Sequence, residues 1–296
     1  MARVVLTGSQ GQLASDIARL WPQSQLAARG DELVPLPHAA LDVTDAEQAR
    51  RVLAEVRPRL VINTAAFLRV DDCEREATQA LLVNAVGPKN LAEACREAGA
   101  KLAHFSTDYV FDGKKRAPYL ESDAPRPLNA YAVSKLAGEH FVRYLLPVDH
   151  LIVRSSGLYG VAGSSGKGGN FVETMLGLAR GGGPIRVVND QVTCPTHTLD
   201  FAATFLDLLG RDASGLFHIT NAGQCSWYEF AAEVFAQLKL APELAPVTSD
   251  DYGAPARRPA YSVLANARLN ELGLRQPRPW QEALRRYLEL KGYLVP

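Results

Sequence analysis

The chain of 296 residues has little cysteine, no excess charge of either sign and no long hydrophobic run. Cys73, Cys95, Cys194 and Cys225 lack the spacing of a zinc site or a redox pair, which favours a reduced protein. Lysine plus arginine total 32, as do aspartate plus glutamate, so the charge pattern of a nucleic-acid binder is absent. No apolar stretch approaches the roughly 20 residues that span a bilayer, and the amino terminus enters a strand directly. We expect a cytoplasmic protein that binds neither nucleic acid nor membrane.

The first half of the chain alternates short aliphatic strands with longer helical patterns. Such alternation, with continuous apolar strands, implies a parallel sheet covered by helices on both faces. The predicted class is therefore α/β, a doubly wound Rossmann-type sheet, with ligands beyond the carboxyl ends of the strands. The strands are expected at 3–7, 32–36, 60–65, 101–107 and 151–155.

The last third of the chain is less regular, and we expect a smaller α/β substrate-binding domain there. The dinucleotide-binding domain is predicted over 1–155, and 196–224 is expected to return to it. The substrate-binding domain is predicted over 156–195 and 225–296. None of the six histidines has metal-like spacing, so no metal site is expected.

A turn of small residues follows the first strand. Gly8, Gly11 and Ala14 are spaced by three and precede an apolar helix face. Small residues at this spacing allow a tight turn and close approach of a pyrophosphate to a helix amino terminus. An ordinary glycine-rich turn is the alternative, which the flanking strand and helix disfavour. No acidic residue for a ribose 2′-hydroxyl and no basic cluster for a 2′-phosphate follow the second strand, where Leu36-Pro37-His38 stands. Asp42 is a candidate for the adenine end, or a turn carboxylate.

The chemistry-bearing segment is a helix predicted over 130–145, with Asn129 as its cap. Tyr131 and Lys135 share one face of this helix. A free tyrosine has a pKa of about 10, so proton transfer near neutrality requires the pKa to fall by roughly 3. An ammonium about 4 Å away supplies an interaction of that order. Thr107, at the end of the preceding strand, can hydrogen-bond a carbonyl oxygen. Alone, Tyr-x-x-x-Lys is a common pair on helix surfaces. The glycine turn, the strand-end hydroxyl and this helix follow one another along the chain, and together they favour a hydride-transfer enzyme.

The order of these segments resembles the extended short-chain dehydrogenase/reductase superfamily and, within it, the dTDP-4-dehydrorhamnose reductase family. The resemblance covers nearly the whole chain. It includes Asn63-Thr-Ala-Ala66, Ser106-Thr-Asp-Tyr-Val-Phe111, Tyr131-Ala-Val-Ser-Lys135, Asn170-Phe171 and Arg257-Arg258-Pro259.

The resemblance implies that Tyr131 is the acid, that Lys135 lowers its pKa and contacts the nicotinamide ribose, and that Thr107 orients the keto group. The implied reaction is NADPH-dependent reduction, with NADH as an alternative cofactor, of the C4 keto group of a nucleotide-linked 4-keto-6-deoxysugar. The expected substrate is dTDP-4-dehydro-L-rhamnose and the product dTDP-L-rhamnose, for polysaccharide biosynthesis.

The resemblance also implies two sets of binding residues. The cofactor is expected at Gly8, Gln10, Gly11, Gln12, Leu13, Asp42, Val43, Ala65, Ala66, Tyr131 and Lys135. The sugar nucleotide is expected at Asp108, Val110, Phe111, Asn170, Phe171 and Arg257. Arg257 and Arg258 are interpreted either as a diphosphate clamp, which suits arginine geometry, or as solvated surface residues. Trp227 is interpreted as the start of a packed helix, with a nucleobase platform as the less favoured alternative.

Two other functions stay open at this point, an epimerase or dehydratase that retains NAD, and a non-catalytic NADP-binding regulatory subunit. Related dehydratases carry Thr-Asp-Glu where this chain has Tyr109 after Thr107 and Asp108, which favours simple reduction. Gly157 and Thr193 depart from the reductase pattern and leave the sugar undecided. Formation of a homodimer is likewise left open.

Overall fold

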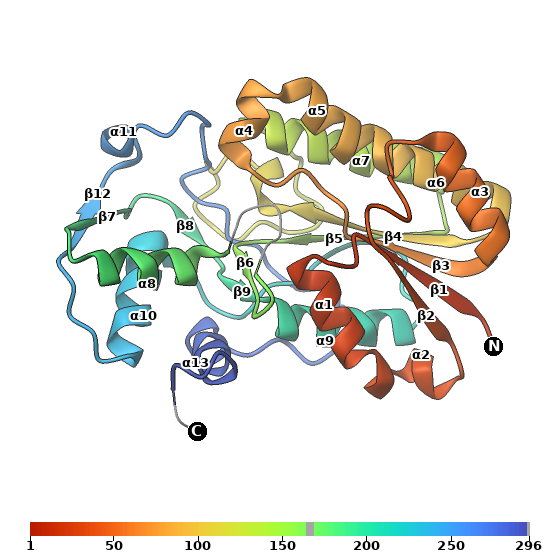
Figure 1. Cartoon of the computed structure of the whole chain (residues 1–296). Coiled ribbons are helices and arrows are strands. Elements are labelled where there is room, and N and C mark those ends of the chain that lie inside the picture. The colour runs from red at the N-terminus through yellow and green to blue at the C-terminus, as the bar shows by residue number, and fades with distance from the viewer. Residues whose placement is uncertain (164–168, 295–296) are drawn as a thin grey trace.

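A six-stranded parallel sheet forms the centre of the protein (Figure 1). The structure is a computed structural model that describes residues 1–163 and 169–294. The strand order is β10-β5-β4-β3-β1-β2, so the order reverses between β1 and β3, the place where open α/β sheets bind ligands. The strands are β1 (Arg3–Thr7), β2 (Glu32–Leu36), β3 (Pro58–Asn63), β4 (Lys101–Thr107), β5 (His150–Ser155) and β10 (Gly215–His218). The predicted doubly wound α/β class is confirmed.

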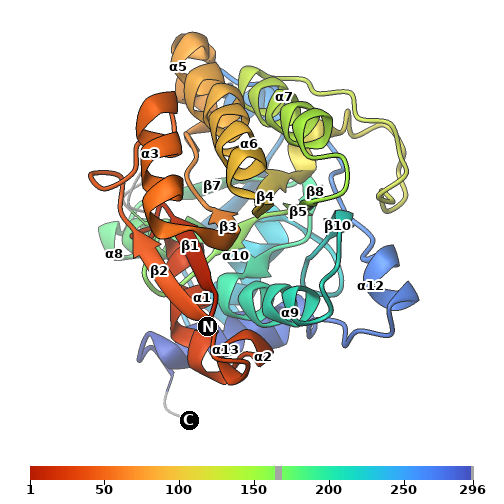
Figure 2. The same ribbon diagram turned by 90° about the vertical axis from the view of Figure 1, so that its right-hand side faces the viewer.

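Helices cover both faces of the sheet, as Figures 1 and 2 show from two directions. One face carries α3 (Ala46–Val56), α6 (Gly87–Ala98) and α7 (Ala130–Leu145), and the other carries α1 (Gln12–Leu20) and α9 (Thr198–Gly210). The arrangement follows from strand geometry, because successive side chains point to opposite faces. Val4 and Leu6 of β1 therefore join the core with α1 and α9, whereas Val5 joins the core with α3 and α6.

A smaller part with its own apolar core lies beside the carboxyl ends of the strands (Figure 1). Phe230 and Tyr287 are among its fully buried side chains. Its helices are α8 (Phe171–Gly181), α10 (Trp227–Gln237), α11 (Ser249–Tyr252) and α13 (Trp280–Leu290). Its strands pair as β6 (Leu158–Tyr159) with β9 (Thr196–His197), β7 (Ile185–Val188) with β12 (Leu244–Val247), and β8 (Val192–Thr193) with β11 (Cys225–Ser226).

The carboxyl-terminal half contributes to both parts. Strand β10 lies beside β5, and α9 packs against α1. The segment 196–224 therefore includes one strand of the large sheet and one helix that covers it. The short helix α12 (Ala267–Glu271) falls inside the range predicted for the smaller domain. Its Leu269 nevertheless packs into the core beneath the sheet. None of the helices in the described parts of the chain combines the length and apolar character of a membrane span.

The connection between β3 and β4 is less regular than a continuous helix. It consists of α4 (Val70–Arg75), α5 (Ala77–Leu81), a π-helical turn at Leu82–Val86, and then α6. The π turn points the Asn84 side chain at the loop after β3, where its amide oxygen accepts from the Phe67 amide at 2.9 Å and its nitrogen donates to the Phe67 carbonyl at 3.0 Å. A Cβ on Gly138 of α7 would lie 2.3 Å from the Asn84 carbonyl oxygen, so glycine allows this close contact. The π turn thus holds the loop at the site described next.

Candidate active site

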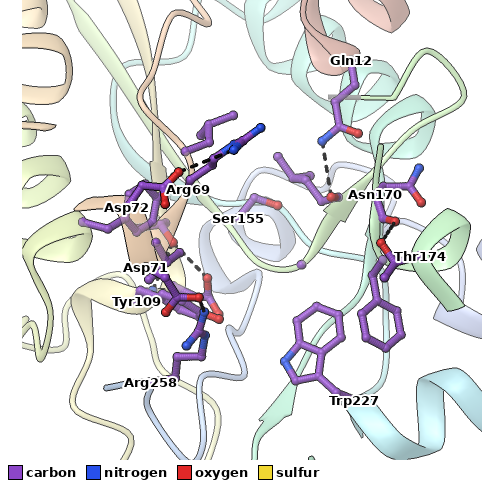
Figure 3. A pocket seen from close by; sticks show the side chains of 18 of the residues that line it. Gln12, Arg69, Asp71, Asp72, Tyr109, Ser155, Asn170, Thr174, Trp227 and Arg258 are labelled. Atoms are coloured by element: carbon purple, nitrogen blue, oxygen red, sulfur yellow. Dashed lines mark hydrogen bonds and ion pairs between the residues drawn. The ribbon is translucent and has the colours of Figure 1, made fainter. Parts of the chain in front are cut away.

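Two adjoining cavities open at the carboxyl ends of the strands. The first, about 330 Å³, lies at the switch point between β1 and β3. The second, about 580 Å³, lies between the sheet and the smaller part, and Figure 3 shows the side chains around it. The two cavities share five lining residues: Gln12, Leu68, Ser106, Tyr131 and Leu158. A ligand in one cavity can therefore meet a ligand in the other at Tyr131.

The first cavity has the geometry of a dinucleotide site. Gly8 follows β1 with φ +61°, and a Cβ there would lie 2.9 Å from the Ala65 amide nitrogen, so only glycine fits without strain. Gly11 is the N-cap of α1, with its own amide bonded to the Gly8 carbonyl at 2.9 Å. The first amides of a helix lack partners within the helix and attract anions. These residues fit a pyrophosphate held against the turn.

All of the residues predicted to contact the cofactor line this first cavity. They are Gly8, Gln10, Gly11, Gln12, Leu13, Asp42, Val43, Ala65, Ala66, Tyr131 and Lys135. At the junction with the second cavity, Gln12 Oε1 and Ser106 Oγ are buried without a hydrogen-bond partner among the described residues. Buried polar atoms normally find a partner, which supports a polar ligand at this point.

Asp42 lies where it could contact the adenine end of a cofactor, and it is also a turn carboxylate, the two alternatives that the sequence left open. Its side chain lines the cavity, and Oδ1 also accepts from the Thr44 amide at 2.9 Å and the Thr44 hydroxyl at 2.8 Å. Partial burial alone would raise the pKa of Asp42, but the two bonds from Thr44 and the charge of His38 lower it overall. The carboxyl is therefore ionised near neutral pH.

The catalytic candidates come from two elements that meet at the junction. Tyr131 lies in the first turn of α7, where the Asn129 side chain caps the helix by accepting from the Ala132 amide at 2.8 Å. Thr107 is the last residue of β4, and its hydroxyl accepts from the Tyr109 amide at 3.2 Å. The Thr107 hydroxyl also hydrogen-bonds the Tyr131 phenol. The structure thus brings together the predicted acid and the predicted carbonyl-orienting hydroxyl.

The pKa of Tyr131 differs from the sequence-based expectation. Burial raises it, the nearby Asp108 charge raises it further, and the Thr107 hydrogen bond lowers it only in part. The pKa of Tyr131 therefore lies above its ordinary value and not below it as predicted, because desolvation of the phenolate outweighs the groups that stabilise it. A neutral phenol is still the form that donates a proton.

Lys135 lies one helical turn after Tyr131 and is 3% exposed. Burial lowers its pKa to about 8, while the Glu139 carboxylate opposes that change. Glu139 itself is held by Arg154 of β5 through two bonds, at 2.8 Å to Nε and 2.7 Å to Nη2. The buried ion pair between Glu139 and Arg154 therefore holds α7 against the sheet one helical turn after Lys135.

Asp108 is a buried carboxyl at the floor of the second cavity. It accepts from the Thr107 hydroxyl at 3.1 Å, from the Ser156 hydroxyl at 2.8 Å, and from the Ser262 hydroxyl. Burial raises the pKa of Asp108 to about 6, against which the three hydroxyls act. The carboxyl orders the hydroxyl that faces the phenol.

This raised pKa predicts a pH-dependent cost of keeping Asp108 ionised. The folded state binds the Asp108 proton more tightly than the unfolded chain does. Protonation of Asp108 therefore stabilises the fold fully below the ordinary pKa of 3.8, and this stabilisation is lost as pH rises to about 6. The free energy of unfolding of Asp108→Asn minus that of the parent should therefore rise by about 2–3 kcal/mol between pH 4 and pH 7. Urea unfolding across this range measures the difference. In the control Asp112→Asn, where hydrogen bonds outweigh burial and lower the carboxyl pKa, the trend should be small and opposite. A flat difference for Asp108→Asn would contradict the assignment.

Three of the six predicted sugar-nucleotide residues line the second cavity, namely Asp108, Asn170 and Phe171. The Asn170 side chain caps α8, accepting from the Glu173 amide at 3.1 Å, and donates to the Gly160 carbonyl at 3.0 Å and the Tyr287 hydroxyl at 3.1 Å. Its main observable role is thus to position α8 at the cavity wall.

Val110 and Phe111 do not line the cavity, contrary to expectation. A 3-10 turn at Asp108–Val110 follows β4 and turns both side chains inward. Both are fully buried, and Phe111 stacks on Tyr119 with ring centroids 4.1 Å apart. The prediction that they contact the substrate is therefore wrong, and both side chains instead pack in the core beside the site.

Arg257 is also misplaced by the sequence interpretation, because its side chain is exposed and its neighbour Arg258 lines the cavity. Figure 3 shows Arg258 beside Asp71 and Tyr109. Arg258 donates to Asp71 Oδ2 at 2.9 Å and hydrogen-bonds the Tyr109 hydroxyl, while the Ala256 amide bonds Asp71 Oδ1 at 3.1 Å. The sequence Arg257-Arg258 indicated that an arginine lines the cavity, but it did not show which of the two residues does so.

Aromatic residues line the opposite wall. Trp227 is the first residue of α10 and packs on Phe171, with centroids 4.7 Å apart and an interplanar angle of 42°. It also borders the cavity, as Figure 3 shows, so it combines a packing position with an accessible ring. Gly157, at φ +55°, borders the same space, and a Cβ there would lie 3.4 Å from the tip of the Trp227 indole.

The chain is similar to known proteins over almost its full length. Residues 2–292 match the family described as RmlD substrate binding domain. The sequence is 40% identical over 289 residues to the spore coat polysaccharide biosynthesis protein SpsK of Bacillus subtilis, covering 98% of each chain. It is 40% identical over 285 residues to a dTDP-4-dehydrorhamnose reductase of Mycolicibacterium smegmatis, covering 95% of this chain and 84% of that protein.

Solved structures show the same likeness. The crystal structure of a dTDP-4-dehydrorhamnose reductase from Clostridium acetobutylicum has a TM-score of 0.90 and 39% identity, covering 97% of this chain and 99% of that one. The corresponding reductase from Bacillus anthracis, solved in complex with NADP, has a TM-score of 0.90 and 37% identity, covering 98% and 99%.

Proposed function

The chain belongs to the dTDP-4-dehydrorhamnose reductase family, and from this we propose that it is an NADPH-dependent oxidoreductase that reduces the C4 keto group of a dTDP-linked 4-keto-6-deoxysugar. The observation that carries the proposal is the position of Tyr131 on the wall of both cavities. Lys135 lines the first cavity with it, and Thr107 lines the second.

The residues divide the chemistry between them. NADPH, when bound in the first cavity, supplies the hydride that adds to C4. The Tyr131 phenol supplies the proton to the carbonyl oxygen, so that hydride and proton together convert the ketone to an alcohol. By turning its one hydrogen from Asp108 to the same oxygen, Thr107 holds the carbonyl beside the phenol. Lys135, cationic below a pH of about 8, offsets the negative charge that develops on the phenol as its proton leaves.

The specific substrate that we propose is dTDP-4-dehydro-L-rhamnose. Relatives named as dTDP-4-dehydrorhamnose reductases support it. Gly157 leaves little room for a side chain, since a Cβ there would lie 3.2 Å from Pro195 Cα and 3.4 Å from the Trp227 ring. The Thr193 hydroxyl is hydrogen-bonded to the Ser156 hydroxyl. Neither departure from the reductase pattern removes a group that the reaction uses.

The two alternative functions have less support. An elimination acid would stand after Asp108, where Tyr109 is engaged by Arg258 and burial raises its pKa to about 12. A silent regulatory subunit would not require Tyr131 on both cavity walls, with Lys135 on the first wall and Thr107 on the second.

The proposal is tested with the purified protein, NADPH and a panel of 4-keto sugar nucleotides, by following the absorbance of the reduced nicotinamide. We expect oxidation of NADPH with dTDP-4-keto-6-deoxysugars, fastest with dTDP-4-dehydro-L-rhamnose, and none with their 4-hydroxy counterparts. Absence of oxidation with every keto sugar would contradict the proposal. A protein that carries stoichiometric NAD and turns over without added cofactor would favour the epimerase or dehydratase alternative.

A further inference from the structure

The chain around Arg258 reaches the wall of the second cavity without forming a helix or a strand. Backbone polar groups in such a segment need partners outside regular secondary structure, and two side chains supply them here. Asp71 Oδ1 of α4 accepts from the Ala256 amide at 3.1 Å. The Asn129 amide nitrogen donates to the Arg257 carbonyl at 2.8 Å. The backbone just before Arg258 is thus held by α4 and by the residue that begins α7.

Asn129 is 5% exposed and uses both polar atoms of its side chain. The oxygen caps α7 by accepting from the Ala132 amide at 2.8 Å. Only the oxygen of an amide side chain can accept, so the nitrogen is the atom that faces the Arg257 carbonyl. Asparagine, aspartate and serine cap helices about equally well, but only asparagine has a separate donor while its oxygen caps. Capping alone therefore does not account for asparagine at this position.

These contacts determine where the Arg258 side chain lies. Pro259 restricts the backbone of the residue before it, and the Arg257 carbonyl is held from outside the segment. The Arg258 guanidinium donates to Asp71 Oδ2 at 2.9 Å and lines the cavity on the wall opposite Trp227 (Figure 3). The Arg258 side chain is 19% exposed, so a ligand can still reach it. A guanidinium in this position suits the oxygens of a diphosphate.

We propose that Asn129 is a positioning residue for the substrate, because its bond to the Arg257 carbonyl fixes the distance between Arg258 and Tyr131. This inference rests on the proposed function, in which a dTDP-linked sugar presents its keto group to Tyr131 and its diphosphate to Arg258. Asn129 lies two residues before Tyr131, so a single side chain orders the helix turn of the acid and the segment of the cation. Asn129 is not among the described residues that line either cavity, so it acts through Arg258.

Two substitutions separate the cap from the donor. Asn129→Ser keeps an oxygen that caps α7 and removes the amide nitrogen. The dissociation constant of dTDP, measured by isothermal titration calorimetry, should rise about fivefold to tenfold, as expected for one lost buried hydrogen bond. Asn129→Asp, also a good cap, places a second carboxylate oxygen against the Arg257 carbonyl and should weaken dTDP binding at least as much.

Steady-state kinetics distinguish positioning of the substrate from a general loss of structure. In both Asn129 variants the KM of the 4-keto sugar nucleotide should rise by a factor similar to that for dTDP. The kcat at saturation and the NADPH dissociation constant should change by less than about twofold, because the cap that orders Tyr131 is kept. Thermal unfolding midpoints verify that the variants fold.

A double-mutant cycle tests whether Asn129 acts through Arg258. Arg258→Gln removes the cation and should weaken dTDP binding more than either Asn129 variant does. The double variant Asn129→Ser with Arg258→Gln should bind dTDP no more weakly than Arg258→Gln alone, since the second change removes the group that the first displaces. Asp45→Ser replaces the cap of α3 on a residue outside the described lining of both cavities, and it should behave like the parent.

The outcomes separate this inference from the proposed function. Parent-like dTDP affinity in both Asn129 variants, a loss of kcat without weaker dTDP binding, or losses that add in the double variant would each overturn the inference and leave the reductase proposal intact. Failure of the parent to bind dTDP would overturn the proposed function, and the inference with it.

Discussion

Tyr131→Phe should lower kcat for reduction of a dTDP-linked 4-keto sugar by about a thousandfold, because it removes the proton that the product hydroxyl requires. A positioned general acid contributes roughly 10²–10⁴-fold. The substitution deletes one oxygen and keeps the ring, which packs edge-on against Tyr109 with centroids 6.3 Å apart. Burial holds the Tyr131 proton in place at neutral pH, and no other described side chain combines a proton to donate with a place on both cavity walls and a hydrogen bond to Thr107.

The measurement compares steady-state rates and NADPH dissociation constants of the parent and the variant. The dissociation constant should change by less than about threefold, since the phenol acts on the sugar and not on the cofactor phosphates. Tyr144→Phe is the matched control, because Tyr144 lies on the same helix and is 81% exposed. Equal rates for Tyr131→Phe and the parent would remove Tyr131 as the acid.

Glu139→Ala should destabilise the protein by about 3–5 kcal/mol, because it leaves Arg154 as an unpaired charge in the interior. The paired side chains are 2% and 1% exposed. Arg154 also lies over the Phe111 ring, with its guanidinium carbon 5.2 Å from the centroid, so it cannot turn to solvent without disrupting the packing below the site.

Urea unfolding of the parent and variants measures this cost. Glu289→Ala, which breaks surface pairs to Arg285 and Arg286, is the control and should cost less than about 1 kcal/mol. The double variant Glu139→Leu with Arg154→Met should recover most of the loss, because an apolar pair of similar volume needs no charge partner. If Glu139→Ala costs no more than the surface control, the buried pair has no structural importance.

The features that could be predicted from the sequence are those that local chemistry determines. Asn129 was recognisable as a cap because proline precedes it and an apolar helical pattern follows, and its side chain does bond the Ala132 amide. The cofactor cavity followed from Gly8 and Gly11, since a tight turn before a helix needs small residues. These residues interact mainly with near neighbours, so tertiary structure changes little about them.

The misplaced features depend on contacts between distant segments. Val110 and Phe111 follow β4 directly, but a 3-10 turn changes their direction and buries them. The choice between Arg257 and Arg258 depends on Asp71, which is far away in the chain and bonds Arg258. Spacing alone could not reveal either contact.

The pKa of Tyr131 is a further property that spacing does not determine. The helical separation from Lys135 was correct, yet spacing carries no information about how deeply a phenol is buried or where Asp108 lies. Desolvation is set by the whole site, and here it outweighs the expected effect of a neighbouring cation. The π turn at Leu82–Val86 was similarly unpredictable, since its close approach to Gly138 joins segments that are far apart in the sequence.

Transfer of hydride to C4 of a sugar held between Thr107 and Tyr131 can be followed with NADPH deuterated at the transferable nicotinamide position, a dTDP-4-keto-6-deoxysugar, and NMR analysis of the product. We expect an alcohol with deuterium at C4 of the sugar and one equivalent of oxidised cofactor. Deuterium at another carbon, or an isomerised keto sugar with the label retained on the cofactor, would contradict this transfer.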